Sequence, residues 1–445
     1  MPLTRERAEE IFKQVLKYST ADETEAMMSS TSYSLTRFAN NTIHQNVQEE
    51  GSYLSVRAVA GQRTARASTN RFDETSIRQA AEAALELART QPPDPDLLPM
   101  PAPQTYRAVN RSYGETAELT PKARAETVKI AIARAEKDQL TAAGIFSSGA
   151  SAFGLFNSRG LAAFHEETLS EFSVTMLGPT SSGWAKRTSP LALELDAEAL
   201  ADRAARKALG SVDPKEIQPG RHTVILEPAA VLDLLGFLFW DFGGLAVHEK
   251  RSCLTDRLGQ KIFGDNVEVR DDVFHPLQSG AAFDGEGMPR QRVTLVEKGV
   301  AKNLVYSRAS AKAARRKPTG HGFALPNEYG EAPMNLVFSG GESTVEKMVA
   351  STDRGLLVTR LWYIREVDPY EKVMTGMTRD GLFLVENGRV TSAVKNFRFN
   401  QSLIEMLRNV ELMSPAVRAT GEESFEMVVP AMKVRDFHFS EVTKF

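Results

Sequence analysis

Six prolines within residues 91–104 constrain the fold of this chain more than any other feature of its sequence. Proline has a fixed φ and no backbone N–H, so this segment cannot form a helix or an internal strand. The segment must therefore run extended. It is either a linker between two domains or a long surface excursion within one domain.

A second break, at residues 211–220, separates two halves of different character. It contains Pro214, Pro219 and Gly220, which favour an irregular connection. At about 150 residues per domain, a chain of 445 residues suggests two or three domains. We predict an α+β protein with an N-terminal α/β domain at residues 1–215. A C-terminal domain, mainly antiparallel β with a few helices, follows at residues 216–445.

Periodic patterns place the main elements of the N-terminal half. Apolar residues at helical spacing predict helices over residues 4–18, 73–89 and 196–209. Thr120 followed by Pro121 predicts the start of a further helix, with threonine as the N-cap. Residues 54–58 alternate as a strand does, and we expect Gly51 and Gly61 to form the turns at its two ends.

In the C-terminal half, Pro228 begins a helix that is apolar on all sides and therefore buried. We expect this helix to end at Gly243-Gly244. Two hairpins are predicted over residues 293–305 and 382–394, with turns at Lys298-Gly299 and Asn387-Gly388. Their similar sequences, LVEKG and LVENG, record either an internal duplication or, as we favour, shared turn chemistry.

Composition and charge exclude several classes of protein. Hydrophobic residues make up 42% of the chain and charged residues 25%, as in soluble globular proteins. A core of this size needs no disulfide or metal for stability. The net charge of -3 offers no basic surplus for binding nucleic acid. We interpret one basic cluster as a solvated helix end rather than a phosphate site; it consists of Lys312, Arg315, Arg316 and Lys317.

The sequence predicts a cytoplasmic protein without a membrane segment. Its single cysteine, Cys253, cannot form an intrachain disulfide, which fits a reducing compartment. Residues 1–7 carry charges where a signal peptide needs an apolar run. The most apolar stretch, residues 229–242, is interrupted by two aspartates and is too short to span a bilayer.

His248, Glu249 and Cys253 resemble part of a metal site. In zinc peptidases two histidines one helical turn apart bind the metal, and a glutamate activates water. Here no second histidine stands at residues 251–253, and Cys253 would point away from His248 on a helix. We therefore interpret His248-Glu249 as a surface dipeptide. We expect residues 165–167, His-Glu-Glu, to be exposed as well.

Two glycine-flanked loops offer candidate ligand-binding residues. Asp284 and Glu286 alternate with glycines and could serve as acid and base or bind a hard cation. Alternatively, they belong to a turn that leads into the next strand. His321 also lies between glycines, and could exchange a proton or bind a carboxylate. We take Asp284, Glu286 and His321 as the candidate residues for binding a peptide or another ligand.

Six segments occur in a characteristic order along most of the chain. They are residues 150–156 (ASAFGLF), 171–186, 250–260 (KRSCLTDRLGQ), 283–289 (FDGEGMP), 319–322 (TGHG) and 387–398. In order and rough spacing, this set resembles the TldD/TldE family of metallopeptidases, also known as PmbA or modulator of DNA gyrase. The chain has no phosphate-binding loop, dinucleotide glycine fingerprint or Gly-x-Ser-x-Gly elbow that would indicate another enzyme class.

The resemblance implies a two-domain fold, a dimer, and a role in the degradation or maturation of peptides. In the TldD branch, a His-Glu-x-x-x-His helix and a late cysteine bind the metal. Counted back from residues 257–260, that motif would fall on residues 235–240 (LGFLFW), none of which can bind zinc. Residues 415–445 contain no cysteine. The chain therefore resembles the TldE/PmbA branch. We expect no metal, other cofactor or catalytic residue in this chain, and zinc in a TldD-like partner.

Two functions remain open at this point. In the first, which we favour, the chain is a non-catalytic subunit that pairs with a TldD-like peptidase subunit and helps to form the channel for a peptide substrate. In the second, the chain pairs with itself and binds a peptide or small ligand through residues 284–287 and 319–322. A metallohydrolase built on His248 and Glu249 is a third reading.

Overall fold

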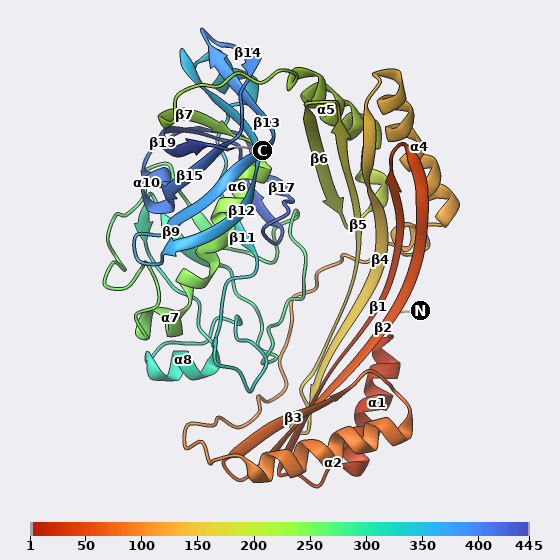
Figure 1. Cartoon of the computed structure of the whole chain (residues 1–445). Helices are drawn as coiled ribbons and strands as arrows, with labels where there is room; N and C mark the ends of the chain where they lie inside the picture. Colours follow the sequence, from red (N-terminus) through yellow and green to blue (C-terminus); the bar gives the residue numbers. More distant parts are fainter. Residues whose placement is uncertain (1–2, 444–445) are drawn as a thin grey trace.

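One long antiparallel sheet organises the N-terminal half of the molecule. The structure, a computed structural model, describes residues 3–443. The sheet has six strands in the order β3-β2-β1-β4-β5-β6, and every neighbouring pair is antiparallel. Figure 1 shows these strands curving along most of the height of the molecule. Their bounds are β1 (Glu23–Ala39), β2 (Thr42–Ala60), β3 (Arg63–Thr69), β4 (Thr141–Asn157), β5 (Ala162–Leu177) and β6 (Ser182–Ser189).

Helices cover this sheet separately at the two ends of its long strands (Figure 1). One hydrophobic cluster, which includes Ile11 and Ile77, forms under the first two helices. A second cluster, which includes Val128 and Phe172, forms under the later two. The helices are α1 (Arg5–Tyr18) and α2 (Glu74–Thr90) at one end, and α4 (Pro121–Lys137) and α5 (Ala197–Gly210) at the other, with short turns α3 (Gly114–Ala117) and η1 (Ala192–Glu194).

Local sequence signals place the starts of these helices correctly. The side chain of Thr120 accepts a hydrogen bond from the backbone N–H of Ala123, and Pro121 occupies the first turn of α4. Thr4, Asp73 and Asp196 cap α1, α2 and α5 in the same way. The predicted helices at residues 4–18, 73–89 and 196–209 are thus confirmed, with ends within one or two residues.

The prediction of a turn at Gly51 is wrong, because β2 runs straight through this residue. Gly51 pairs with Thr31 of β1 in the middle of the strand. A Cβ atom at Gly51 would lie 2.8 Å from the Thr31 hydroxyl oxygen. The glycine therefore allows a close approach between strands rather than a turn. The turn at Gly61, with φ of +62°, is present as predicted.

The C-terminal half contains two sheets around one large hydrophobic core. Most pairs are antiparallel, and β12–β7 and β11–β18 are parallel. The first sheet contains β7 (Gly220–Leu226), β12 (Arg354–Asp368), β13 (Val373–Glu386), β14 (Arg389–Ala393), β15 (Phe397–Ser402), β16 (Val410–Met413) and β19 (Met432–Val442). The second contains β8 (Val269–Asp271), β9 (Val293–Glu297), β10 (Val300–Ala301), β11 (Leu336–Phe338), β17 (Val417–Ala419) and β18 (Met427–Val429). The predicted α+β class is confirmed, although the sheet of the N-terminal half is entirely antiparallel.

Short helices complete the C-terminal half. They are α6 (Pro228–Leu235), η2 (Gly236–Phe242), α7 (Gly244–His248), α8 (Arg308–Ala313), α9 (Val345–Ala350) and α10 (Leu403–Arg408). The apolar helix that begins at Pro228 changes to a 3-10 helix at Gly236 rather than continuing as one α-helix to Gly243. Both predicted hairpins form: Lys298-Gly299 and Asn387-Gly388 have positive φ at both positions. No helix within residues 3–443 is long and apolar enough to cross a bilayer.

The proline-rich segment runs extended between α2 and α3 and contacts both halves of the molecule. The backbone N–H of Met100 donates to Glu23 Oε2 of β1 at 2.8 Å, and Asn157 Nδ2 of β4 donates to the carbonyl of Pro101 at 2.8 Å. From the other half, Arg308 Nη2 donates to the carbonyl of Pro99 at 2.7 Å. The segment connects helices that pack on the same sheet, and it also fastens that sheet to the C-terminal half.

Candidate functional site

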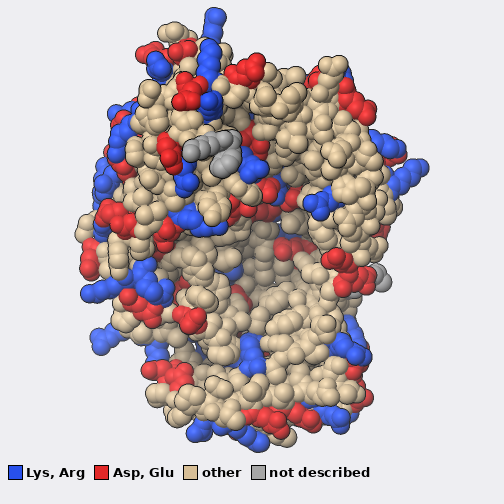
Figure 2. Space-filling model, in the orientation of Figure 1, with Lys and Arg blue, Asp and Glu red and all other residues tan. Residues whose placement is uncertain are grey.

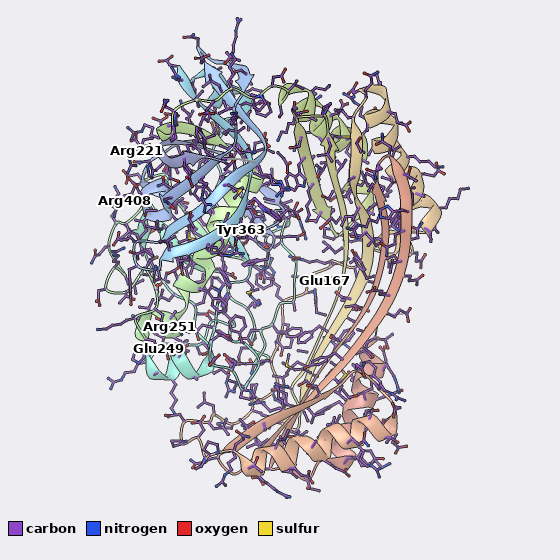
Figure 3. All side chains as sticks on the ribbon, in the orientation of Figure 1. Glu167, Arg221, Glu249, Arg251, Tyr363 and Arg408 are labelled. Carbon is purple, nitrogen blue, oxygen red and sulfur yellow. The ribbon has the colours of Figure 1, made fainter. Side chains whose placement is uncertain are left out.

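A hollow separates the long sheet from the C-terminal half. Figure 2 shows it at the centre of the molecular face, and Figure 3 places Glu167 of β5 on its sheet side. Glu167 Oε2 accepts a hydrogen bond from the backbone N–H of Gly280 at 2.8 Å and lies 3.3 Å from His165 Nε2. Burial would raise the pKa of Glu167, but the bonds from His165 and Gly280 outweigh it and lower the pKa. His165, predicted to be exposed, is buried.

The loop that carries Asp284 and Glu286 projects from the C-terminal half onto the sheet. Phe283 packs between Tyr106 and Phe153, with ring centroids 5.3 and 5.7 Å apart. The hydroxyl of Tyr106 donates to the carbonyl of Gly287 at 2.8 Å. Tyr106 thus holds the loop both through its ring and through its hydroxyl group, on either side of the two carboxylates in the sequence.

Both carboxylate oxygens of Asp284 accept hydrogen bonds from backbone N–H groups. Oδ1 accepts from Glu286 at 3.0 Å and from Met288 at 2.8 Å, and Oδ2 accepts from Gly322 at 2.7 Å. Burial raises the pKa of Asp284, and these amides oppose the rise. Asp284 therefore joins residues 284–288 to the loop that contains His321, and its acceptor sites are largely occupied.

Glu286 is buried beside this junction. Its Oε2 accepts a hydrogen bond from the backbone N–H of Arg308, the first residue of α8, at 2.8 Å. Burial, reinforced by the nearby charge of Asp284, raises the pKa of Glu286 to about 7. A carboxyl group in this state can donate or accept a proton near neutral pH. Glu286 is the member of the predicted set with chemistry suited to a ligand.

His321 lies inside the C-terminal half and is 1% exposed. Its Nε2 is 2.8 Å from Asp271 Oδ1, and its Nδ1 is 2.9 Å from the hydroxyl of Thr319. Burial would raise the pKa of Asp271, but the pairing with His321 lowers it. His321 is therefore engaged on both ring nitrogens, and it reaches Asp284 only through the backbone of Gly322.

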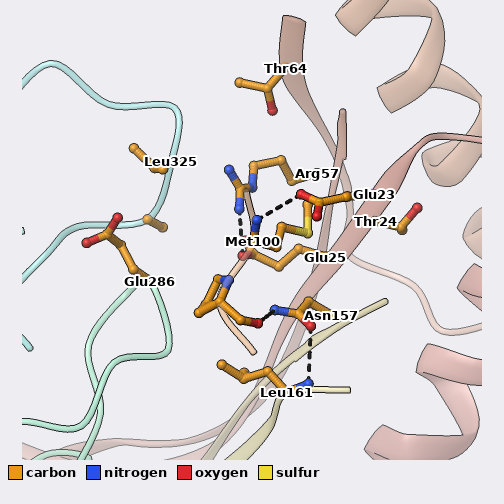
Figure 4. Close-up of polar contacts among 12 residues, drawn as sticks. Glu23, Thr24, Glu25, Arg57, Thr64, Met100, Asn157, Leu161, Glu286 and Leu325 are labelled. Atoms are coloured by element: carbon orange, nitrogen blue, oxygen red, sulfur yellow. Dashed lines mark hydrogen bonds and ion pairs between the residues drawn. The ribbon is translucent and has the colours of Figure 1, made fainter. Parts of the chain in front are cut away.

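A buried ion cluster on the sheet faces this loop (Figure 4). Glu25 of β1 receives Arg57 Nη2 at 2.9 Å and also the guanidinium of Arg66. Arg66 Nε donates in addition to the carbonyl of Leu325 in the C-terminal half. Our sequence reasoning did not identify these residues. The available signal was Arg57 itself, a charged residue in the middle of the apolar strand at residues 54–60.

The segment at residues 235–240 is where the family resemblance places a zinc-binding helix. Leu235 is fully buried and Leu238 is 1% exposed. A Cβ atom at Gly236 would lie 1.9 Å from the hydroxyl oxygen of Ser424. The segment is thus buried at Leu235, Gly236 and Leu238 and exposed at Trp240, and none of its side chains can bind zinc.

The other possible metal ligands are scattered. His248 and Glu249 are exposed at the end of α7, and Glu249 pairs with Arg251 at 2.5 Å. Figure 3 shows Glu249 and Arg251 on the side of the C-terminal half away from the long sheet. Cys253 is buried, which raises the pKa of its thiol. Across residues 3–443, no three His, Cys, Asp or Glu side chains gather closely enough to hold a metal ion.

Three domain families match this chain in succession. Their descriptions are PmbA/TldA metallopeptidase domain 1, central domain and C-terminal domain, and they match residues 24–88, 114–212 and 219–441. The first two matches lie on the long sheet with its helices, and the third spans the two sheets of the C-terminal half.

Curated relatives and solved structures agree with these matches. The chain is 26% identical to the metalloprotease PmbA of Escherichia coli O157:H7 over 83% of this chain and 82% of that protein. It is 22% identical to a metalloprotease TldD homolog of Haemophilus influenzae over 88% of each. The structure of TldE from Thermococcus kodakarensis has a TM-score of 0.88 at 22% identity and covers 98% of this chain and 100% of that one. The likeness to this structure shows a shared fold.

Proposed function

Because this chain belongs to the PmbA/TldD family of metallopeptidases, we propose that it is a TldE-like subunit without a metal site of its own. In this proposal it pairs with a TldD-like chain that holds zinc, and the pair degrades or matures peptides. The observation that carries the proposal is the packing of residues 235–240, where Leu235 and Leu238 are buried and Gly236 touches Ser424.

Zinc chemistry would then be supplied by the partner. Bound zinc acidifies a water molecule and polarises the peptide carbonyl. The contribution of this chain is to bind and orient the peptide in the hollow beside the long sheet. We assign Glu286 to the floor beneath the peptide, where its charge acts on the ligand, since its carboxyl group is 4% exposed and is held by a single described hydrogen bond, from Arg308. We assign Asp284 and His321 to holding the loop in place.

Because of this assignment, a change at Glu286 is a better test than a change at Asp284. Replacing Asp284 with alanine would leave three backbone N–H groups without their acceptor, so the loop itself would be disturbed. Glu286→Gln keeps an oxygen for the N–H of Arg308 and removes only the ability to ionise. The matched control is Glu328→Gln, which makes the same chemical change at an exposed residue.

The experiment combines purification, metal analysis and peptidase assays. The chain is expressed alone and with a TldD-like chain from the same genome, and zinc is measured by mass spectrometry. We expect zinc and peptidase activity in the mixed complex, reduced activity with Glu286→Gln, and unchanged activity with Glu328→Gln. Full zinc-dependent activity from this chain alone would overturn the proposal. A homodimer that binds peptide but ignores the TldD-like chain would favour a stand-alone binding protein.

The proposal includes a cytoplasmic location, supported by a lone cysteine that is buried as a free thiol. Fractionation of cells that express the tagged full chain tests this part, and recovery with secreted or membrane material would contradict it.

A further inference from the structure

A second cavity lies at the seam between the two halves, apart from the Glu286 loop. It has a volume of about 570 Å³, within the range of small-ligand sites, which commonly occur at domain interfaces. Strand β6 forms one wall and β17 contributes to the opposite wall; Figure 1 shows the two strands near each other. Arg418 Nε of β17 donates to the Thr188 hydroxyl of β6 at 3.2 Å, which closes one side of the cavity.

The cavity is lined by more cations than carboxylates. Its basic residues are Lys186, Arg187, Arg203, Lys207 and Arg418, and its acidic residues are Glu194, Asp196 and Glu227. A ligand anion can bind those cations that have no carboxylate partner within the protein.

Three of the five cations already have carboxylate partners. Lys207 Nζ is 2.5 Å from Glu227 Oε2. Lys186 Nζ lies between Glu171 and Glu422, at 3.2 and 3.4 Å, and Arg418 is paired with Glu426. These cations are neutralised and fasten the two halves together, so they are not available to a ligand.

Arg187 and Arg203 are different, because within residues 3–443 no carboxylate forms an ion pair with either of them. The acidic lining residues do not supply one. Glu194 accepts a hydrogen bond from the Ser189 hydroxyl at 2.6 Å, and Asp196 caps α5 through the backbone N–H of Ala199. Both arginines are exposed, so the recess presents two guanidinium groups that a ligand anion can reach.

The rest of the wall contains both polar side chains, such as Thr188 and Thr420, and apolar ones. Trp184 is 5% exposed, and Arg360 lies over its ring at 4.8 Å from the centroid. Leu277 and Val417, on the C-terminal side, are 39% and 42% exposed. A ligand that fits this wall carries a carboxylate at one end and an aliphatic or aromatic group beside it.

We propose that this cavity binds a peptide carboxylate through Arg187 and Arg203, with a neighbouring apolar residue packed against Leu277 and Val417. Guanidinium groups match carboxylates in charge and can donate two parallel hydrogen bonds. The carboxylate comes from a free C-terminus or from an acidic side chain. The inference rests on the proposed function in that the ligand is a peptide, and it adds a preference for peptides that carry a negative charge.

Three short peptides of the same apolar sequence distinguish the sources. The first has an acetylated N-terminus and a free C-terminus. The second is acetylated and amidated and contains one glutamate. The third is acetylated and amidated and has no charge. Binding to the full chain is measured by isothermal titration calorimetry at low and moderate salt, because screening weakens exposed ion pairs.

We expect the first or second peptide to bind at least tenfold more tightly than the third. Arg187→Ala with Arg203→Ala should abolish that difference, and Arg203→Lys should restore part of it, since lysine keeps the charge but not the planar donor pair. Arg206→Ala is the matched control, because Arg206 is on the same helix and pairs with Asp202. Equal affinity for all three peptides, no binding of any, or unchanged binding in the double variant would each overturn the inference.

These outcomes are separate from those that test the proposed function. If the mixed complex is active but all three peptides bind this chain equally, only the carboxylate site is wrong. If this chain alone is a zinc peptidase, the helper role is wrong whatever the peptides show.

Discussion

Glu286→Gln removes a charge that the fold opposes. The Glu286 carboxyl is 4% exposed and accepts one hydrogen bond from the backbone of Arg308. Burial and the neighbouring Asp284 raise its pKa from the ordinary value of 4.5 to about 7. Glutamine has nearly the same shape, keeps an oxygen for the Arg308 N–H and cannot ionise. The substitution therefore separates the effect of charge from the effect of packing.

The expected magnitude follows from that pKa. Each pH unit between 4.5 and 7 is worth about 1.4 kcal/mol, so ionised Glu286 destabilises the folded protein by about 3 kcal/mol. The unfolded chain loses this proton first as the pH rises. The stabilising contribution is thus fully present below about pH 4.5, falls as the pH approaches 7 and is absent above it. The Glu286→Gln protein should lack this loss.

Urea unfolding at pH 5, 6, 7 and 8, followed by circular dichroism, measures the effect. The free energy of unfolding of the variant minus that of the native chain should grow across this series, and most of the growth should occur below pH 7. Other groups titrate in both proteins and cancel in the difference. Glu328→Gln, the same change at an exposed residue, should give a constant difference. A constant difference for Glu286→Gln as well would refute the account of its environment.

Three further predictions use the same measurements. Asp284→Asn replaces one of two oxygens that together accept three backbone N–H groups, so we expect a loss of about 1–3 kcal/mol in the free energy of unfolding. Gly183→Ala would place a Cβ atom 2.1 Å from the carbonyl oxygen of Ala204 and should lower the melting temperature by several degrees, whereas Gly114→Ala, with open space around it, should not. Burial raises the pKa of Asp233 to about 7, so Asp233→Asn should gain stability relative to the native chain as the pH rises toward 7, and equal pH profiles would contradict this.

Local signals in the sequence predicted those parts of the fold that depend on neighbouring residues. Thr120 and Pro121 mark a helix start, and Asn387-Gly388 marks a tight turn, because each acts within a few residues. Gly51 was misread as a turn because the contact that explains it is not local, and the contact that explains Gly236 is not local either. The first faces Thr31 across a strand pair, and the second faces Ser424, so neither contact is visible in a local pattern.

For the candidate site, too, the sequence predicted local features but not contacts between distant residues. Glycines around Asp284 and Glu286 indicated a loop, and the structure shows that this loop packs against the backbone of another, since a Cβ at Gly285 would lie 2.4 Å from the N atom of Ala324. The sequence could not show that both carboxylate oxygens of Asp284 would accept hydrogen bonds from backbone N–H groups. It also could not show that Asp271, far away in the chain, would occupy His321.

The contacts between the two halves determine whether the cleft can close on a ligand. Tyr106 donates to Gly287, Gly280 donates to Glu167, and Arg111 Nη2 donates to the carbonyl of Val273 at 2.5 Å. These bonds join the N-terminal half to the C-terminal half at separate points, and closing the cleft on a ligand by rigid-body motion would break them. A ligand therefore meets side chains that are already in position, and its affinity depends on desolvation and complementarity rather than on domain closure. A wall fixed in this way can orient a peptide without holding a metal, because orientation requires only that the groups which contact the peptide stay where the fold puts them.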